Sequence, residues 1–150
     1  MTFSAEQQRD LKVQRGIRQA EDNLVQWIQD ALEKTKYKRP GKNGRKNKDK
    51  LEESQFRNLV SVSDTTSSPE VVKNFLRYQV GRGDKWGRGP ESLAERIVSD
   101  IDGNIKATAT EIAQYAESQT ISAIQMELIR RYLGYGARYL TYLNSGSDEN

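Results

Sequence analysis

Apolar residues recur at spacings of three, four and seven along most of the chain, which is the period of a helix packed on one side. Ser4 and Gln7 form a capping-box pair at the start of the first such segment, and Pro40 with Gly41 follows its end. The pattern predicts a helix from Ser4 to about Tyr37. Its apolar positions are Leu11, Ile17, Leu24, Trp27, Ile28, Ala31 and Leu32.

Two shorter helices are predicted next. Residues 50–62 carry apolar side chains at helical spacing. After a polar linker, Ser68 is suited to cap a helix, Pro69 suits its first position, and Glu70 favours the positive end of the helix dipole. Gly81 is expected to stop this third helix.

Two longer helices complete the predicted fold. The first spans 90–116, with a kink expected at Gly103, and the second spans 120–143. No segment shows the alternation of a strand, and residues 144–150 are expected to form a disordered tail. The sequence therefore predicts an all-α bundle of about five helices in one domain, residues 1–143, with a long basic loop and a glycine-rich loop.

The composition agrees with a thin-cored helical bundle. Of the 150 residues, 35% are hydrophobic and 30% are charged, and the mean hydropathy is −0.87. No apolar run is long enough to span a bilayer, and the first residues lack a signal-peptide pattern. With no cysteine to need an oxidising compartment, a cytoplasmic location is expected.

The absence of both histidine and cysteine bears on catalysis. It removes the commonest general base, the commonest zinc ligands and the best protein nucleophile. Hydrolases and nucleases that use only carboxylates exist, so the absence is a bias rather than a proof. We expect a protein that is not an enzyme and that carries no metal or other cofactor.

Positive charge is concentrated in one segment, although the net charge is only +3. Residues 34–50 carry about +8, because Asp49 is the only acid among nine cations, and this asymmetry favours a polyanionic partner. Residues 38–50 contain no aliphatic side chain and are expected to form a flexible loop. The alternative is a solvated tether. The candidate phosphate-binding residues are Lys42, Arg45, Lys46 and Lys48.

The stretch 81–90, Gly-Arg-Gly-Asp-Lys-Trp-Gly-Arg-Gly-Pro, is the second candidate. Its glycines let backbone amides approach phosphates, and an indole is able to stack on a base. The alternative is a helix connector whose tryptophan packs into the core. The glycine spacing does not match a phosphate-binding loop that follows a strand. The candidates are Arg82, Lys85, Trp86 and Arg88.

Other cations pair up by helical spacing. Lys73 and Arg77 lie four residues apart on one face of the third helix, and the alternative is an ordinary solvated face. Arg131 and Arg138 lie seven apart on the last helix. For these two, the favoured alternative is surface charge offset by Glu127.

Two further patterns favour structural interpretations. Asp100, Asp102, Asn104 and Glu111 match part of a calcium loop, but its obligatory glycine is replaced by isoleucine. The tyrosines of the last helix are expected to belong to the core and to interfaces more than to a base-stacking surface. They are Tyr132, Tyr135, Tyr139 and Tyr142.

Two stretches carry a family resemblance. Ser-Ser-Pro-Glu-Val-Val-Lys-Asn-Phe-Leu-Arg-Tyr-Gln-Val-Gly-Arg, residues 67–82, resembles the helix entry of the small subunits of CRISPR effector complexes, particularly those of type III. The amphipathic stretch 124–143 resembles their closing helix. The likeness covers roughly the second half of the chain, and the basic loop at 38–50 departs from compact members of the family.

The resemblance implies a non-catalytic subunit of a ribonucleoprotein. Such subunits are helical bundles that stack in several copies beside other effector subunits. They hold the guide–target duplex or the displaced single strand through backbone contacts. The matching basic positions are Lys73 and Arg77. The alternatives are a helical protein–protein adaptor that uses the tyrosine-lined last helix, or an RNA- or DNA-binding protein outside CRISPR systems.

Overall fold

The computed structural model describes residues 3–39 and 49–147. Its helices are α1 (Ala5–Lys34), α2 (Glu53–Thr65), α3 (Pro69–Arg82), α4 (Leu93–Asp100), a π-helical turn η1 (Ile101–Ile105), α5 (Lys106–Ala116) and α6 (Ile121–Ser147). The helices α4, η1 and α5 follow one another without a break, so the described chain forms five rods. The only β-type pairing among the described residues is an isolated bridge between Lys36 and Ser92. The predicted all-α bundle is confirmed.

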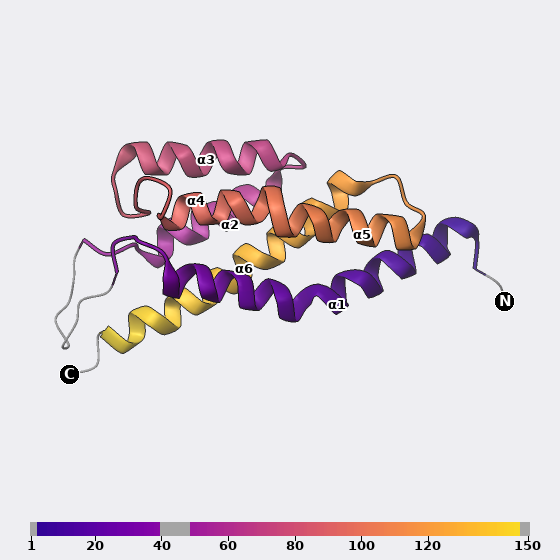
Figure 1. The fold of residues 1–150 in the computed structure, drawn as a ribbon, viewed down its shortest axis with the longest axis horizontal. Helices are drawn as coiled ribbons and strands as arrows, with labels where there is room; N and C mark the ends of the chain where they lie inside the picture. Colours follow the sequence, from indigo (N-terminus) through magenta and orange to yellow (C-terminus); the bar gives the residue numbers. More distant parts are fainter. Residues whose placement is uncertain (1–2, 40–48, 148–150) are drawn as a thin grey trace.

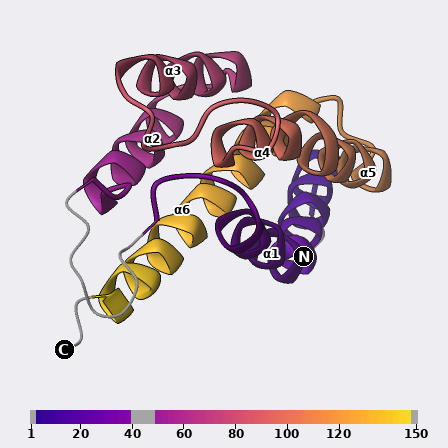
Figure 2. The same ribbon diagram turned by 60° about the vertical axis from the view of Figure 1, so that its left-hand side comes forward.

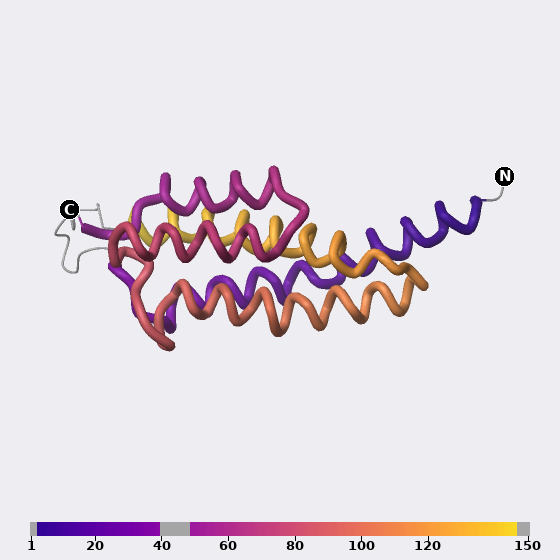
Figure 3. Tube along the Cα trace, turned by 90° about the horizontal axis from the view of Figure 1, so that it is seen from above, coloured from indigo at the N-terminus to yellow at the C-terminus, as the bar shows by residue number. Residues whose placement is uncertain are grey.

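Helix α6 lies at the centre of the bundle. It packs against α1, α2 and α5, and α3 packs on α2 (Figures 1 and 2). The first turns of α1 project beyond the other helices (Figure 3). Side chains from every helix join one buried apolar cluster. At its centre α6 passes so close to α1 and α2 that only a glycine, Gly136, fits between Ile28 and Phe56.

Several predicted helix ends are displaced. Helix α1 ends at Lys34 rather than near Tyr37, because Thr35 is extended while its backbone N–H still bonds to the Ala31 carbonyl. Helix α2 begins at Glu53 rather than at 50. Helix α4 begins after Ser92, whose hydroxyl accepts the Glu95 backbone N–H, and not at Pro90.

The prediction of a disordered tail is wrong for residues 144–147. Helix α6 continues to Ser147, and Asn144 is buried with its side-chain amide donating to the Leu51 carbonyl at 3.4 Å. The helix persists because its buried face extends through this turn. Residues 148–150 lie outside the described residues.

The kink expected at Gly103 is a π-helical turn. Such a turn frees backbone groups, and the Gln125 side chain donates to the Ile101 carbonyl at 3.1 Å. Asp100 and Asp102 are part of this helical rod and do not form a calcium loop. In the described part of the chain, no three His, Cys, Asp or Glu side chains gather closely enough to hold a metal ion.

Candidate nucleic-acid interface

Two basic segments that are distant in sequence are joined at one end of the bundle. The backbone N–H of Lys38 donates to the Lys85 carbonyl at 3.0 Å, and that of Leu93 donates to the Lys36 carbonyl at 3.1 Å. The Leu51 N–H donates to the Lys38 carbonyl at 2.9 Å. We call this place the connector end; it comprises residues 35–39, 49–52 and 83–92, at the left of Figure 1.

These bonds correct the expectation of a flexible loop at 38–50. Lys38 is fixed by two backbone hydrogen bonds, and its ammonium lies 3.8 Å from the Asp49 carboxylate. Both ends of the expected loop therefore belong to the ordered bundle. The predicted phosphate-binding residues between them lie outside the described residues; they are Lys42, Arg45, Lys46 and Lys48.

Trp86 is a core residue, and its prediction as a base-stacking residue is wrong. Its side chain is fully buried and its ring centroid lies 5.3 Å from that of Phe56. Next to it, Gly87 has φ +81°, and a Cβ there would come 2.1 Å from the Lys36 carbonyl oxygen. Tryptophan and glycine together fix the connector to the bundle, because one fills the core and the other permits close approach.

Lys73 is also not available to a ligand. Its side chain is only 7% exposed, and its ammonium bonds to Asp102 at 2.8 Å and to Glu70 at 2.7 Å. These hydrogen bonds raise the pKa of Lys73 above its usual value, so it stays charged. Its role is to tie α3 to the π-turn, and its prediction as a nucleic-acid contact is wrong.

The other predicted cations around α3 are accessible. Arg77, Arg82 and Arg88 are exposed, and the first two make no ion pair with a described residue. Arg82 lies 5.6 Å from the Tyr78 ring centroid. The Arg88 guanidinium donates to the Val80 carbonyl at 3.1 Å, which holds it beside the end of α3. The structure thus leaves these arginines accessible, with Arg77 beside Glu70 and Asn74 on α3 and Arg82 in a different hollow at the end of α3.

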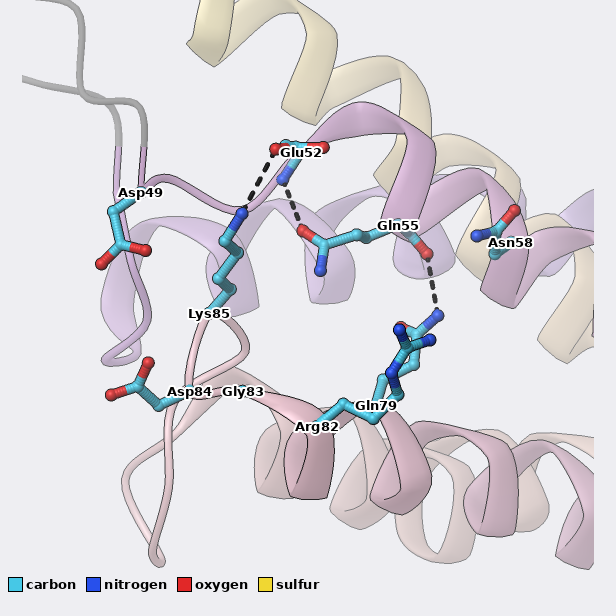
Figure 4. Close-up of a pocket in the computed structure, with 9 residues that line it drawn as sticks. All are labelled: Asp49, Glu52, Gln55, Asn58, Gln79, Arg82, Gly83, Asp84 and Lys85. Atoms are coloured by element: carbon cyan, nitrogen blue, oxygen red, sulfur yellow. Dashed lines mark hydrogen bonds and ion pairs between the residues drawn. The ribbon is translucent and has the colours of Figure 1, made fainter.

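A polar cavity of about 320 Å³ lies between α2 and the end of α3 (Figure 4). Lys85 crosses its rim, with its ammonium 3.2 Å from a Glu52 carboxylate oxygen. The Gln79 amide donates to the Gln55 carbonyl at 3.5 Å, while its own oxygen is buried without a hydrogen-bond partner. Lys85 is therefore partly neutralised, and Arg82 is the accessible cation of this cavity.

The two arginines predicted on the last helix differ in their surroundings. Arg131 lies 2.7 Å from a Glu21 oxygen and 3.1 Å from a Glu127 oxygen, so its charge is neutralised and its predicted role in binding is wrong. The alternative interpretation, a surface charge offset by Glu127, therefore fits Arg131. Arg138 is exposed and lines a groove between α1 and α6 together with three tyrosines.

The charge balance shows where positive charge is in excess. Lys36 pairs with Glu91 at 2.7 Å, so much of the described charge at the connector end is compensated. Four of the cations behind the net charge of +3 fall in 40–48, and the rest of the chain carries a net charge of −1. The excess therefore belongs to that segment, and Arg77, Arg82 and Arg88 add accessible cations near α3.

Sequence reasoning missed an aromatic cluster beside the same segment. Tyr37 and Arg39 stack on each other, with the guanidinium carbon 4.6 Å from the ring centroid, close to the Tyr139 side chain. The signal in the sequence was Tyr37, an aromatic residue between Lys36 and Lys38. Its position indicated only where the first predicted helix ends.

Comparisons with known proteins found nothing similar. No family model matches the chain, and neither the curated proteins nor the solved structures gave a match. None of the described helices combines the length and the apolar character needed to cross a membrane. These results leave the chain's own residues as the guide to its function.

Proposed function

We propose that the protein is a non-catalytic small subunit of a CRISPR ribonucleoprotein effector that grips a nucleic-acid backbone. The observation that carries the proposal is the connector end, where hydrogen bonds join two basic segments almost fifty residues apart in sequence. Arg82 and Arg88 are exposed next to this end, Arg77 is exposed further along α3, and the segment 40–48 holds the largest excess of positive charge.

The mechanism is electrostatic. Lysine and arginine neutralise phosphates and release counterions, which gives affinity without sequence preference. Gly81, Gly83 and Gly89 have no atom within 4 Å of a Cβ built on them, so their backbone is open to close approach by a phosphate. Base sequence would be recognised by the guide RNA and not by this chain.

The resemblance of residues 67–82 and 124–143 to CRISPR small subunits supports the more specific part of the proposal. In that role the ligand is a guide–target duplex or a displaced strand, and the partners are other effector subunits and further copies of this chain. The location would be cytoplasmic. Co-purification with guide RNA from native cells would support this part, and its absence would leave only general backbone binding.

Salt-dependent binding tests the electrostatic mechanism. The variant Arg77→Gln, Arg82→Gln, Arg88→Gln is compared with the wild type in filter binding over a range of salt concentrations. The slope of log affinity against log salt should fall by about 2–3 units, because each lost phosphate contact removes roughly 0.7–0.9. A second variant with glutamine at Lys42, Arg45, Lys46 and Lys48 should show a similar loss.

The matched control removes three exposed arginines from the first half of α1: Arg9, Arg15 and Arg18. Its change in net charge equals that of the variant at Arg77, Arg82 and Arg88. Because these control arginines lie away from the proposed interface, affinity and slope should stay close to those of the wild type. Equal losses in both triple variants, or none in either, would overturn the proposed interface.

A further inference from the structure

An array of aromatic and basic side chains links α6 to the end of α1. The Tyr139 hydroxyl donates to the Glu33 carboxylate, and the Tyr139 and Tyr142 ring centroids lie 5.7 Å apart. On the other side of Glu33, Arg39 donates to the Glu33 backbone carbonyl at 2.9 Å and stacks on Tyr37. The array therefore ends at Arg39, the last described residue before the cation-rich segment.

Tyr142 is the most exposed large hydrophobic side chain among the described residues, at 67%. It borders a groove of about 240 Å³ between α1 and α6. The groove also offers the Gln29 amide, the Arg138 guanidinium and the ring of Tyr135. Aromatic faces beside an amide and a free cation fit a nucleobase with its adjoining phosphate.

We infer that Tyr142, supported by Tyr139, is a stacking platform for an unpaired base, so that the bound nucleic acid is single-stranded where it crosses α6. This inference rests on the proposed function and adds the class of ligand. A base inside a duplex has both faces covered by its neighbours, whereas an unpaired base has a face free for a tyrosine ring. Arg138 would contact a phosphate next to the stacked base.

Two features favour a nucleic acid over a protein as the occupant of this groove. The array is continuous with Arg39 and hence with the chain segment that contains four cations and no acid. The Tyr139 ring is also held in place by its hydroxyl bond to Glu33, so a base would meet a preformed surface. The helical ends that carry the array lie together in Figure 1.

The test compares one strand in two states. Fluorescence anisotropy of the full chain is measured with a dye-labelled oligouridine RNA and with the same strand annealed to its complement. Tyr142→Ala should weaken single-strand binding by about tenfold, within a range of roughly 5- to 150-fold for loss of one stacked base. Duplex affinity and the salt slope should stay unchanged, and Tyr142→Phe should bind as the wild type does.

A second exposed tyrosine, away from the array, provides a matched control. Tyr115 is 55% exposed and has the Lys12 ammonium 5.7 Å from its ring centroid, yet it lies near the first half of α1. Tyr115→Ala should leave both affinities unchanged. Thermal unfolding of each variant checks that the fold is kept.

Each remaining outcome decides against the inference. Unchanged single-strand binding by Tyr142→Ala overturns it, as does an equal loss for single strand and duplex. Loss of a co-purifying protein with unchanged RNA affinity would assign the groove to a protein partner instead. In these cases the electrostatic proposal stands if the salt slope still responds to Arg77, Arg82 and Arg88, whereas a wild type that binds neither RNA overturns both.

Discussion

Two glycines on α6 should respond in opposite ways to the same substitution. A Cβ at Gly136 would lie 2.6 Å from a carbon of Ile28 and 2.6 Å from a carbon of Phe56. A Cβ at Gly134, two residues earlier in the same helix, meets no atom within 4 Å. Alanine should therefore destabilise the protein at Gly136 and stabilise it at Gly134.

The magnitudes follow from packing and helix propensity. Replacing a helical glycine by alanine gains about 0.5–1 kcal/mol at either position. At Gly136 overpacking opposes this gain. Since Ile28 and Phe56 are fully buried and have no room to retreat, we place its cost at about 2–3 kcal/mol. The net change is a loss of about 1–2.5 kcal/mol for Gly136→Ala and a gain of about 0.5–1 kcal/mol for Gly134→Ala.

Thermal unfolding followed by circular dichroism measures the difference. In a chain of this size 1 kcal/mol shifts Tm by roughly 2–4 °C. Gly136→Ala should melt about 2–10 °C below the wild type, and Gly134→Ala about 1–4 °C above it. A Gly136→Ala protein that melts at or above the wild-type temperature would refute the close approach of α6 to α1 and α2.

Three further predictions concern the connector, a buried acid and a tyrosine. Gly87→Ala should lower the free energy of unfolding by about 2–3 kcal/mol in urea titrations, because alanine is strained at positive φ and would clash with the Lys36 carbonyl. Burial raises the pKa of Asp100, so its protonated form favours folding; the wild type should gain stability relative to Asp100→Asn as pH falls from about 7 toward 4, and an unchanging difference would count against this. The hydrogen bond from Tyr139 to Glu33 raises the pKa of Tyr139 to about 12; in ultraviolet titration, Glu33→Gln should bring it back toward 10.

The helices were predictable because local signals agreed with the packing. Ser4 and Ser68 cap α1 and α3 as the sequence indicates. The start of α4 was misplaced because Pro90 and Ser92 both give a helix-start signal. Tertiary structure decides between them, since Glu91 accepts the Lys36 backbone N–H before the helix begins.

The candidate site was less predictable because side-chain direction depends on distant partners. Lys73 and Arg77 are four residues apart, yet Lys73 meets Asp102 from a segment twenty-nine residues away while Arg77 stays in solvent. Trp86 similarly packs on Phe56, thirty residues earlier. Spacing within one helix specifies a shared face but not which end of that face is buried.

The burial of Trp86 changes what the glycine-rich connector is able to contribute to binding. With three glycines, at positions 83, 87 and 89, the connector would lose much conformational entropy on meeting a ligand if it were free in solution. Trp86 in the core and the Arg88 bond to the end of α3 remove part of that cost before binding, because both fix the connector in the folded state. A Trp86→Ala protein that lost nucleic-acid binding would therefore report a detached connector and not a lost stacking contact. Trp86→Phe, which keeps an aromatic ring in the core, should retain most of the affinity.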